Sequence, residues 1–104
     1  MSRAENQDDQ GRTVAKRGPV IRRVDANQHA LVKALRAAGA SVSLTHTIGQ
    51  GYPDLSVGWH GKNLLLEVKS EGGKLTPEEL DWQAQWRGQV ATVHTVEEAL
   101  SLLS

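Results

Sequence analysis

The chain has 104 residues, no cysteine, and 12 basic against 12 acidic side chains. This length suits one domain with one modest core, and the cysteine-free sequence excludes a disulfide framework and a thiolate metal site. No apolar run reaches membrane-spanning length and the first residues show no signal-peptide pattern, so we expect a cytoplasmic protein without a membrane partner. Zero net charge does not by itself indicate nucleic-acid binding.

Residues 1 to 23 are polar and have no hydrophobic periodicity. Such a composition predicts a disordered arm in front of a folded domain of residues 24 to 104. The end of this arm is rich in cations, namely Lys16, Arg17, Arg22 and Arg23. Two interpretations remain open: a solvated arm, and a flexible contact with DNA phosphates that becomes ordered on binding.

The folded domain is predicted to begin with a helix. Asp25 is a suitable N-cap, and Gln28 at the third helical position completes a capping-box pattern. Apolar residues recur at helical spacing until Gly39 ends the helix; they are Leu31, Leu35 and Ala38. Residues 41 to 47 then alternate apolar and polar side chains, which predicts a half-buried strand.

A loop that contains Gly49 and Gly51 leads from this strand to two more. Residues 55 to 59 and 64 to 69 are the predicted strands, with a turn between them. Three consecutive leucines open the second of these runs, which predicts a strand covered on both faces.

A second helix is predicted from Pro77 to Arg87, because Thr76 is a good N-cap and Glu79 completes a capping box. A fourth strand over residues 89 to 95 and a last helix after Thr95 follow. The resulting order is helix, three strands, helix, strand, helix, which predicts an α/β fold.

Charged side chains stand at the ends of two predicted strands. Asp54 directly precedes one strand, and Glu67 and Lys69 lie at the end of the next. Residues two apart in a strand point to the same side, and charges on a mostly buried strand are costly unless paired or bound to a ligand. Two carboxylates and a lysine suit a site that holds a divalent metal and directs a water at a phosphate. The plainer alternative is a turn aspartate beside a salt-bridged strand pair.

Pro53 and Asp54, followed by Glu67, Val68 and Lys69, resemble the motif of the PD-(D/E)xK nuclease superfamily. With the segment that follows, up to Trp82, the chain is similar to small stand-alone VRR-NUC-type nucleases of phages and prophages, and more distantly to archaeal Holliday-junction resolvases. The resemblance implies a restriction-endonuclease-like αβββαβ core, which is a mixed four-stranded sheet flanked by helices, plus a C-terminal helix. It also implies that the protein is located in the cytoplasm of a bacterial or phage-infected host cell.

The activity implied by this resemblance is hydrolysis of DNA phosphodiester bonds by an endonuclease that uses Mg²⁺ or Mn²⁺, with selectivity for branched or flapped DNA. Asp54 and Glu67 would bind the metal with the Val68 carbonyl, and Lys69 would orient the attacking water. Hard oxygen ligands favour magnesium or manganese over zinc. The alternative is a nucleic-acid-binding module that keeps the nuclease fold but does not cut.

Two positions depart from the pattern of the family. Gln28 stands where related nucleases often carry a metal-binding glutamate, and Glu79 stands where they often carry glutamine. Gln83, one turn later, is a candidate source of the missing amide, so all three are candidate supporting residues. Further DNA contacts are predicted at Gly49, Gly51 and Lys74.

The apolar spacing of the second helix predicts a two-fold homodimer. Leu80 and Ala84 share one stripe of this helix, while Trp82 and Trp86 share another that is nearly opposite. If one stripe packs on the core of the protein, the other is available to a second copy. The alternative is that both tryptophans belong to the core.

Overall fold

The structure is a computed structural model that describes residues 23 to 104. Residues 1 to 22 lie outside the described residues, together with three of the predicted DNA contacts, Lys16, Arg17 and Arg22. Seven elements follow each other in the predicted order. They are α1 (Arg23–Ala37), β1 (Ser41–Leu44), β2 (Leu55–Trp59), β3 (Lys62–Val68), α2 (Pro77–Gln85), β4 (Val90–Val93) and α3 (Val96–Ser101).

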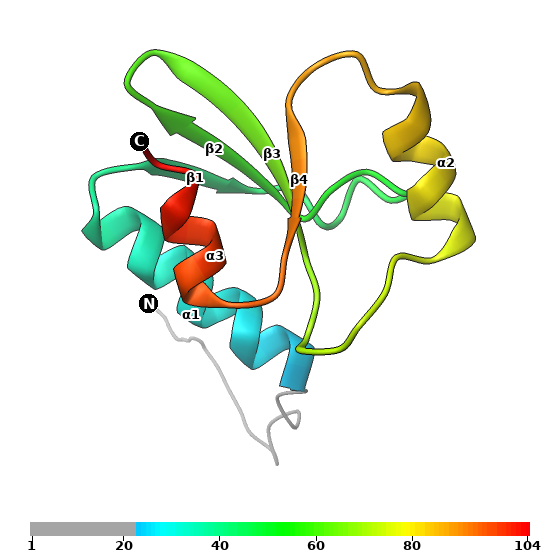
Figure 1. Cartoon of the computed structure of the whole chain (residues 1–104), viewed down its shortest axis with the longest axis horizontal. Coiled ribbons are helices and arrows are strands. Elements are labelled where there is room, and N and C mark those ends of the chain that lie inside the picture. Colours follow the sequence, from blue (N-terminus) through cyan, green and yellow to red (C-terminus); the bar gives the residue numbers. More distant parts are fainter. Residues whose placement is uncertain (1–22) are drawn as a thin grey trace, which may run out of the picture.

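One mixed sheet of four strands forms the centre of the molecule (Figure 1). The strands lie in the order β1-β2-β3-β4; the β1–β2 and β2–β3 pairs are antiparallel, and the β3–β4 pair is parallel. A tight turn at His60 and Gly61 joins β2 to β3, whereas the parallel pair is connected through α2. The fold is therefore α/β, with helices on both sides of the sheet.

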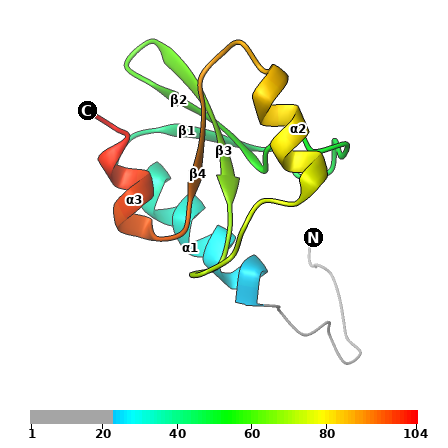
Figure 2. The same cartoon turned by 45° about the vertical axis from the view of Figure 1, so that its right-hand side comes forward.

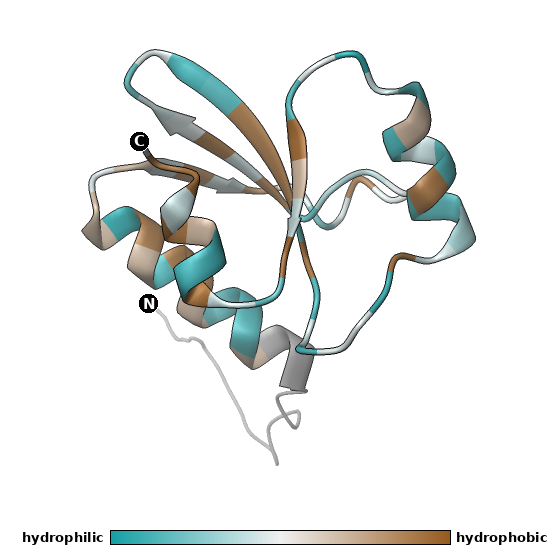
Figure 3. Ribbon diagram, in the orientation of Figure 1, coloured by the Kyte–Doolittle hydropathy of each residue, from teal (hydrophilic) through white to brown (hydrophobic). Residues whose placement is uncertain are grey.

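The core lies between one face of the sheet and the helices α1 and α3, which pack side by side (Figures 1 and 2). Because side chains alternate along a strand, every second residue of β2 and β3 points into this layer. The apolar parts of the strands gather there in Figure 3. The buried side chains are Leu31, Val32, Leu35, Ala40, Val42, Leu55, Val57, Leu66, Val68, Val93 and Ala99.

Helix α2 lies against the opposite face of the sheet and is held in a different way. None of its residues is buried, and most of it is hydrophilic in Figure 3. The predicted capping box is present: Thr76 Oγ1 accepts the Glu79 N–H at 3.2 Å, and the Glu79 carboxylate accepts the Thr76 N–H at 2.8 Å. Local capping therefore fixes where α2 begins, while few contacts hold it on the sheet.

The ends of α1 show one correct and one wrong prediction. The helix begins at Arg23, so Asp25 lies inside it and is not its N-cap. Its C-terminal end agrees with the prediction, because the Ala40 N–H donates to Leu35 O at 3.0 Å and the Gly39 N–H donates to Arg36 O at 3.0 Å. This pair of hydrogen bonds is a Schellman motif.

The first strand is shorter than predicted and ends at Leu44 instead of Thr47. Beyond Leu44, the Thr45 N–H donates to Asp54 O and its hydroxyl donates to Pro53 O, at 2.8 Å each. This binds the end of β1 to the chain just before β2.

Cover on both faces of β3 is found only at its end. Glu67 and Val68 are buried on opposite faces, whereas Leu64 and Leu65 are half-buried and the strand starts at two exposed residues. The prediction from the leucine run, that the strand is covered on both faces, was therefore wrong for most of β3, because α2 reaches only the last part of the strand. None of the helices between residues 23 and 104 is long and apolar enough to cross a membrane.

Candidate active site

Strand pairing brings Asp54 opposite Glu67. Leu55 at the start of β2 pairs with Leu66 of β3, so the preceding residue, Asp54, lies beside Glu67. Asp54 Oδ2 accepts a hydrogen bond from the Val68 N–H at 2.9 Å, which ties the carboxylate to the end of β3. The sequence predicted that these two carboxylates come from neighbouring strands, and the geometry has them side by side.

Glu67 is a buried carboxylic acid surrounded by other acids. Only 3% of the residue is exposed. Burial, followed by the negative charges of Asp54 and Glu79, raises the pKa of Glu67 from 4.5 to about 8. Glu67 therefore holds a proton at neutral pH unless a cation takes the place of that proton.

Lys69 is the cation nearest to these acids. Its Nζ lies 2.7 Å from Glu79 Oε1 and 3.7 Å from Glu67 Oε2. Burial works to lower the pKa of Lys69, but the hydrogen bond and charge of Glu79 outweigh burial and raise it above its ordinary value. Burial likewise opposes the change at Glu79, whose pKa is lowered by the hydrogen bond from Lys69. Lys69 is thus a fixed ammonium group held mainly by Glu79.

The other candidate supporting residues lie in two places. Gln83 Nε2 donates to Thr92 Oγ1 at 3.2 Å, and Thr92 pairs with Glu67 across β3 and β4, so this amide borders the site. Gln28 instead lines a groove of about 650 Å³ along α1, whose described lining is Gln28, His29, Val32, Lys33, Arg36 and Leu44. No hydrogen bond joins Gln28 to Asp54, Glu67 or Lys69 in the described chain.

Asn27, which the sequence analysis did not select, reaches the end of the site from α1. Its Nδ2 donates to Lys69 O at 2.9 Å and to His94 O at 3.1 Å, so one amide joins the ends of β3 and β4. A signal was present in the sequence: Asn27 lies four residues before Leu31 and eight before Leu35, on the buried side of the helix. A polar residue at such a position needs a partner.

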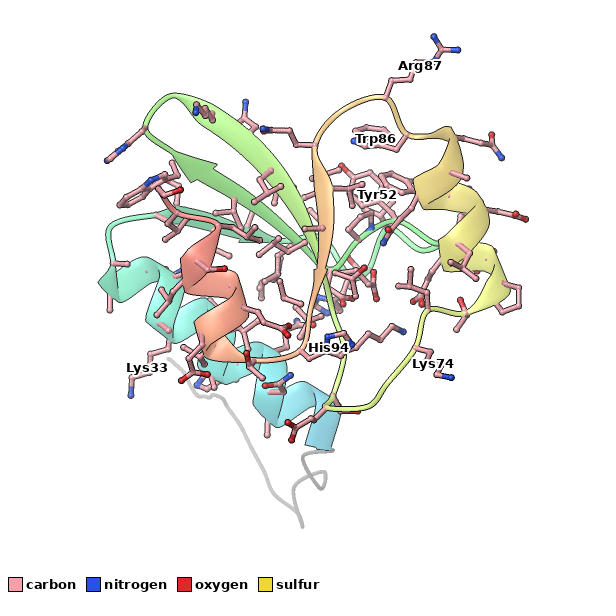
Figure 4. The ribbon with its side chains drawn as sticks, in the orientation of Figure 1. Lys33, Tyr52, Lys74, Trp86, Arg87 and His94 are labelled. Carbon is pink, nitrogen blue, oxygen red and sulfur yellow. The ribbon has the colours of Figure 1, made fainter. Side chains whose placement is uncertain are left out.

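His94 holds the loop between β3 and α2 from the other side. Its Nε2 lies 3.0 Å from Gly73 O and its Nδ1 lies 3.4 Å from Glu98 Oε1. The same loop carries Lys74, which is exposed and points outward in Figure 4. Lys74 is therefore free to meet a ligand, while the loop beneath it is fixed.

The two predicted loop glycines differ in their surroundings. A Cβ at Gly49 would meet nothing within 4 Å, so its backbone is open to a ligand. A Cβ at Gly51 would lie 2.8 Å from Glu78 O and 3.1 Å from Trp82 Cβ. Gly51 is therefore needed for close packing of this loop on α2, a reason that the prediction of a DNA contact did not include.

Three aromatic residues join the same loop to α2. The rings of Tyr52 and Trp82 meet edge to face with centroids 5.1 Å apart, and Trp86 stacks on Trp82 with centroids 4.5 Å apart. The helix stops at Gln85 and not at Arg87 as predicted. Trp86 therefore lies beyond the end of α2 and has an extended backbone conformation. Trp82 is half-buried and Trp86 is 41% exposed, so the alternative that both belong to the core was wrong.

The chemistry of the donor set fits a hard divalent cation. Asp54 and Glu67 supply two adjacent carboxylates, and the Val68 N–H that meets Asp54 shows that the peptide of Val68 faces the β2 side, where its carbonyl also points. In the described part of the chain no three His, Cys, Asp or Glu side chains gather as a metal cluster. A hard divalent cation here would take Asp54, Glu67 and the Val68 carbonyl as ligands, with water at its remaining positions.

Comparison of the chain with protein-family models, with curated proteins and with solved structures finds no match.

Proposed function

We propose that the protein is a Mg²⁺- or Mn²⁺-dependent DNA endonuclease of the PD-(D/E)xK superfamily, with a restriction-endonuclease-like core. The observation that carries this proposal is the placement of Asp54 opposite Glu67 with Lys69 on the same side of β3. Such a site suits a phosphodiester hydrolase. The resemblance of its motif implies that this enzyme acts in the cytoplasm of a bacterial or phage-infected cell.

The residues of the site have separable roles in hydrolysis. Asp54, Glu67 and the Val68 carbonyl would hold the metal. A bound Mg²⁺ or Mn²⁺ would polarise the phosphate and increase the acidity of a water. Lys69 donates hydrogen bonds to that water and to the phosphate oxygens on which charge develops. Glu79 raises the pKa of Lys69 in the metal-free site, and the role we propose for Lys69 is that of a cation.

Glu79 is a positioning residue in this scheme. Its carboxylate accepts hydrogen bonds from both Lys69 and the Thr76 N–H, so the N-terminus of α2 sets where the ammonium group lies. A glutamine there would keep the hydrogen bond to Lys69 but bring no charge. Glu79 therefore neutralises the positive charge of Lys69 through a direct ion pair, in addition to the two acids Asp54 and Glu67.

A non-cutting DNA-binding module is the second candidate. It is favoured by the position of Gln28, which brings no charge and is not bonded to Asp54, Glu67 or Lys69. The cluster of acids argues against it, because Asp54 and Glu79 bring negative charge that would repel a phosphate when no metal is bound.

The two candidates are separated by incubating the purified chain with branched, flapped, single-stranded and duplex DNA. An endonuclease cuts at least one of these when Mg²⁺ or Mn²⁺ is present and none when EDTA is added. Binding without cutting under every metal condition would support the module, and neither binding nor cutting would reject both.

We further propose that the protein forms a two-fold homodimer through α2. Leu80 is 55% exposed and Ala84 on the same stripe is also exposed, whereas Trp82 packs on Tyr52. Two copies would present two metal sites to paired strands. Sedimentation at micromolar concentration should give twice the chain mass for the wild type and the single mass for Leu80→Asp. A monomeric wild type, with and without DNA, would rule out this assembly.

A further inference from the structure

The residues Tyr52, Trp82 and Trp86, here called the aromatic shelf, form an unusual surface on a small protein with four aromatic residues (Figure 4). Trp82 covers one face of the Trp86 ring with an interplanar angle of 20°. A Cβ at Gly88 would lie 2.9 Å from Trp86 Nε1, so the chain after the helix closes on the edge of this indole. Trp86 is held in place on two sides and still 41% exposed.

A cleft of about 370 Å³ adjoins the aromatic shelf, and its described lining contains no basic residue. The lining side chains are two amides, two carboxylates and two indoles, namely Gln50, Glu78, Asp81, Trp82, Gln85 and Trp86. Carboxylates repel a phosphate, but carboxylates and amides accept hydrogen bonds from the amino groups of nucleobases. The cleft therefore suits a base and not the DNA backbone.

Two segments of the chain connect the aromatic shelf with the candidate active site. Tyr52 lies two residues before Asp54. On the other side, α2 carries both Trp82 and Glu79, and Glu79 is bonded to Lys69. Close packing of Gly51 on α2 makes the loop and the helix one body. The aromatic shelf thus has a fixed position relative to the candidate active site, with Glu79 near one end of α2 and Trp86 at the other.

We propose that the aromatic shelf is a stacking subsite for one unpaired nucleobase of the strand that is cut, a role that rests on the proposed nuclease function. A paired base cannot occupy it, because both its faces are stacked and its edge is bonded within the duplex. An unpaired base presents a free face to Trp86 and its edge to the cleft. The enzyme accordingly selects DNA with an unpaired nucleotide on the strand that it cuts.

Tryptophan fluorescence measures this directly. The wild-type protein is titrated with a single strand, with the same strand in a duplex, and with that duplex carrying one unpaired nucleotide, in Ca²⁺ buffer in which the DNA is shown to stay intact. Stacking should quench the emission with the first and third DNAs and weaken it little with the full duplex. Trp86→Leu should remove most of the quench and weaken binding of the unpaired DNAs by roughly tenfold or more.

Two further variants separate stacking from packing. Trp86→Phe keeps a ring and should retain most of the affinity for the unpaired DNAs. Trp59→Phe is the matched control, because Trp59 stacks on His60 away from the aromatic shelf, and it should bind as the wild type does. An abasic site moved along the strand should weaken wild-type binding strongly at one position and leave Trp86→Leu binding unchanged there.

The outcomes distinguish this proposal from the function on which it rests. Equal binding of unpaired DNA by Trp86→Leu and the wild type, in a protein that cuts DNA, overturns the subsite alone. A wild-type dimer that becomes a monomer on Trp86→Leu shows that a second copy occupies the aromatic shelf, which also overturns it. A protein that neither binds nor cuts any DNA overturns the nuclease function and the subsite together.

Discussion

The two faces of β3 have different surroundings, although their residues alternate along one strand. Leu66 and Val68, 1% and 2% exposed, pack into the apolar layer under α1 and α3. Glu67 is 3% exposed, yet its neighbours are Asp54, Glu79 and Lys69. Burial on the first face removes apolar surface from water, whereas burial on the second face withholds water from charges.

The helices that cover the two faces differ in the same way. α1 supplies Leu31 and Leu35, both fully buried, to the core. α2 buries none of its residues and contacts the sheet through polar bonds from Glu79 and Gln83. We therefore expect substitutions on one face to change stability and substitutions on the other to change activity.

The largest effect is expected for the polar face. Asp54→Asn, Glu67→Gln and Lys69→Met should each lower metal-dependent DNA cleavage by roughly 100-fold or more, because each removes a metal ligand or the cation that stabilises developing charge. Cleavage of whichever DNA the wild type cuts best is the measurement, with circular dichroism to show that each variant is folded. Glu97→Gln, an exposed carboxylate of α3, is the matched control. Wild-type rates in all three variants would refute the site.

On the apolar face, Leu66→Ala should lower the free energy of unfolding by about 2–5 kcal/mol, because it leaves a cavity next to α1 and α3. Urea unfolding measures this loss. The fraction of the variant that remains folded should still cut DNA at the wild-type rate, in contrast to Glu67→Gln one residue away. A stable but inactive Leu66→Ala would show that the two faces are not separable.

The contrast between the faces also explains which features could be predicted from the sequence. The capping residue Thr76 acts within one helical turn and bonds as predicted, and Thr95 caps the predicted last helix in the same way. Asp54 and Glu67-x-Lys69 were found because strand alternation and strand pairing are regular. Such signals are local or periodic.

Features that depend on contacts between distant segments were missed. The spacing of Asn27 indicates that it needs a partner, but the partners themselves, Lys69 O and His94 O, come from distant segments and are known only from the packed structure. Helix α2 stops early where Trp86 turns to stack on Trp82, an interaction that also involves Tyr52 from another loop. No rule of helical spacing contains that information.

A smaller effect, in stability, is expected from the ionisation of Glu67. Its pKa is about 8 in the folded protein and 4.5 in the ordinary case, so the folded state holds the proton more tightly. Without metal, the free energy of unfolding should therefore fall as the pH rises from about 4.5 to about 8. Glu67→Gln has no proton to lose, so it should be flatter over this range and more stable than the wild type at its upper end, by a few kcal/mol at most.

The same measurement tests metal binding without using activity. Adding Mn²⁺ at pH 8 should raise the unfolding temperature of the wild type, because the metal replaces the proton on Glu67. The same addition should have little effect on Glu67→Gln, while Glu97→Gln should respond as the wild type does. Parallel pH curves for the wild type and Glu67→Gln would contradict the assigned environment of Glu67.

The smallest effect is expected for the cations that precede the N-terminal end of α1. Asn27 bonds Lys69 O there, so the chain enters the core helix beside the candidate active site. The cations that precede α1 in the sequence lie outside the described residues, and the role predicted for them is contact with the DNA backbone. Replacing Lys16, Arg17 and Arg22 by glutamine should weaken DNA binding and reduce the slope of log affinity against log salt by about 2–3, since each lost phosphate contact accounts for about 0.9. The free energy of unfolding should stay unchanged, which separates this arm from both faces of the sheet. An unchanged salt slope would leave the solvated arm as the correct interpretation.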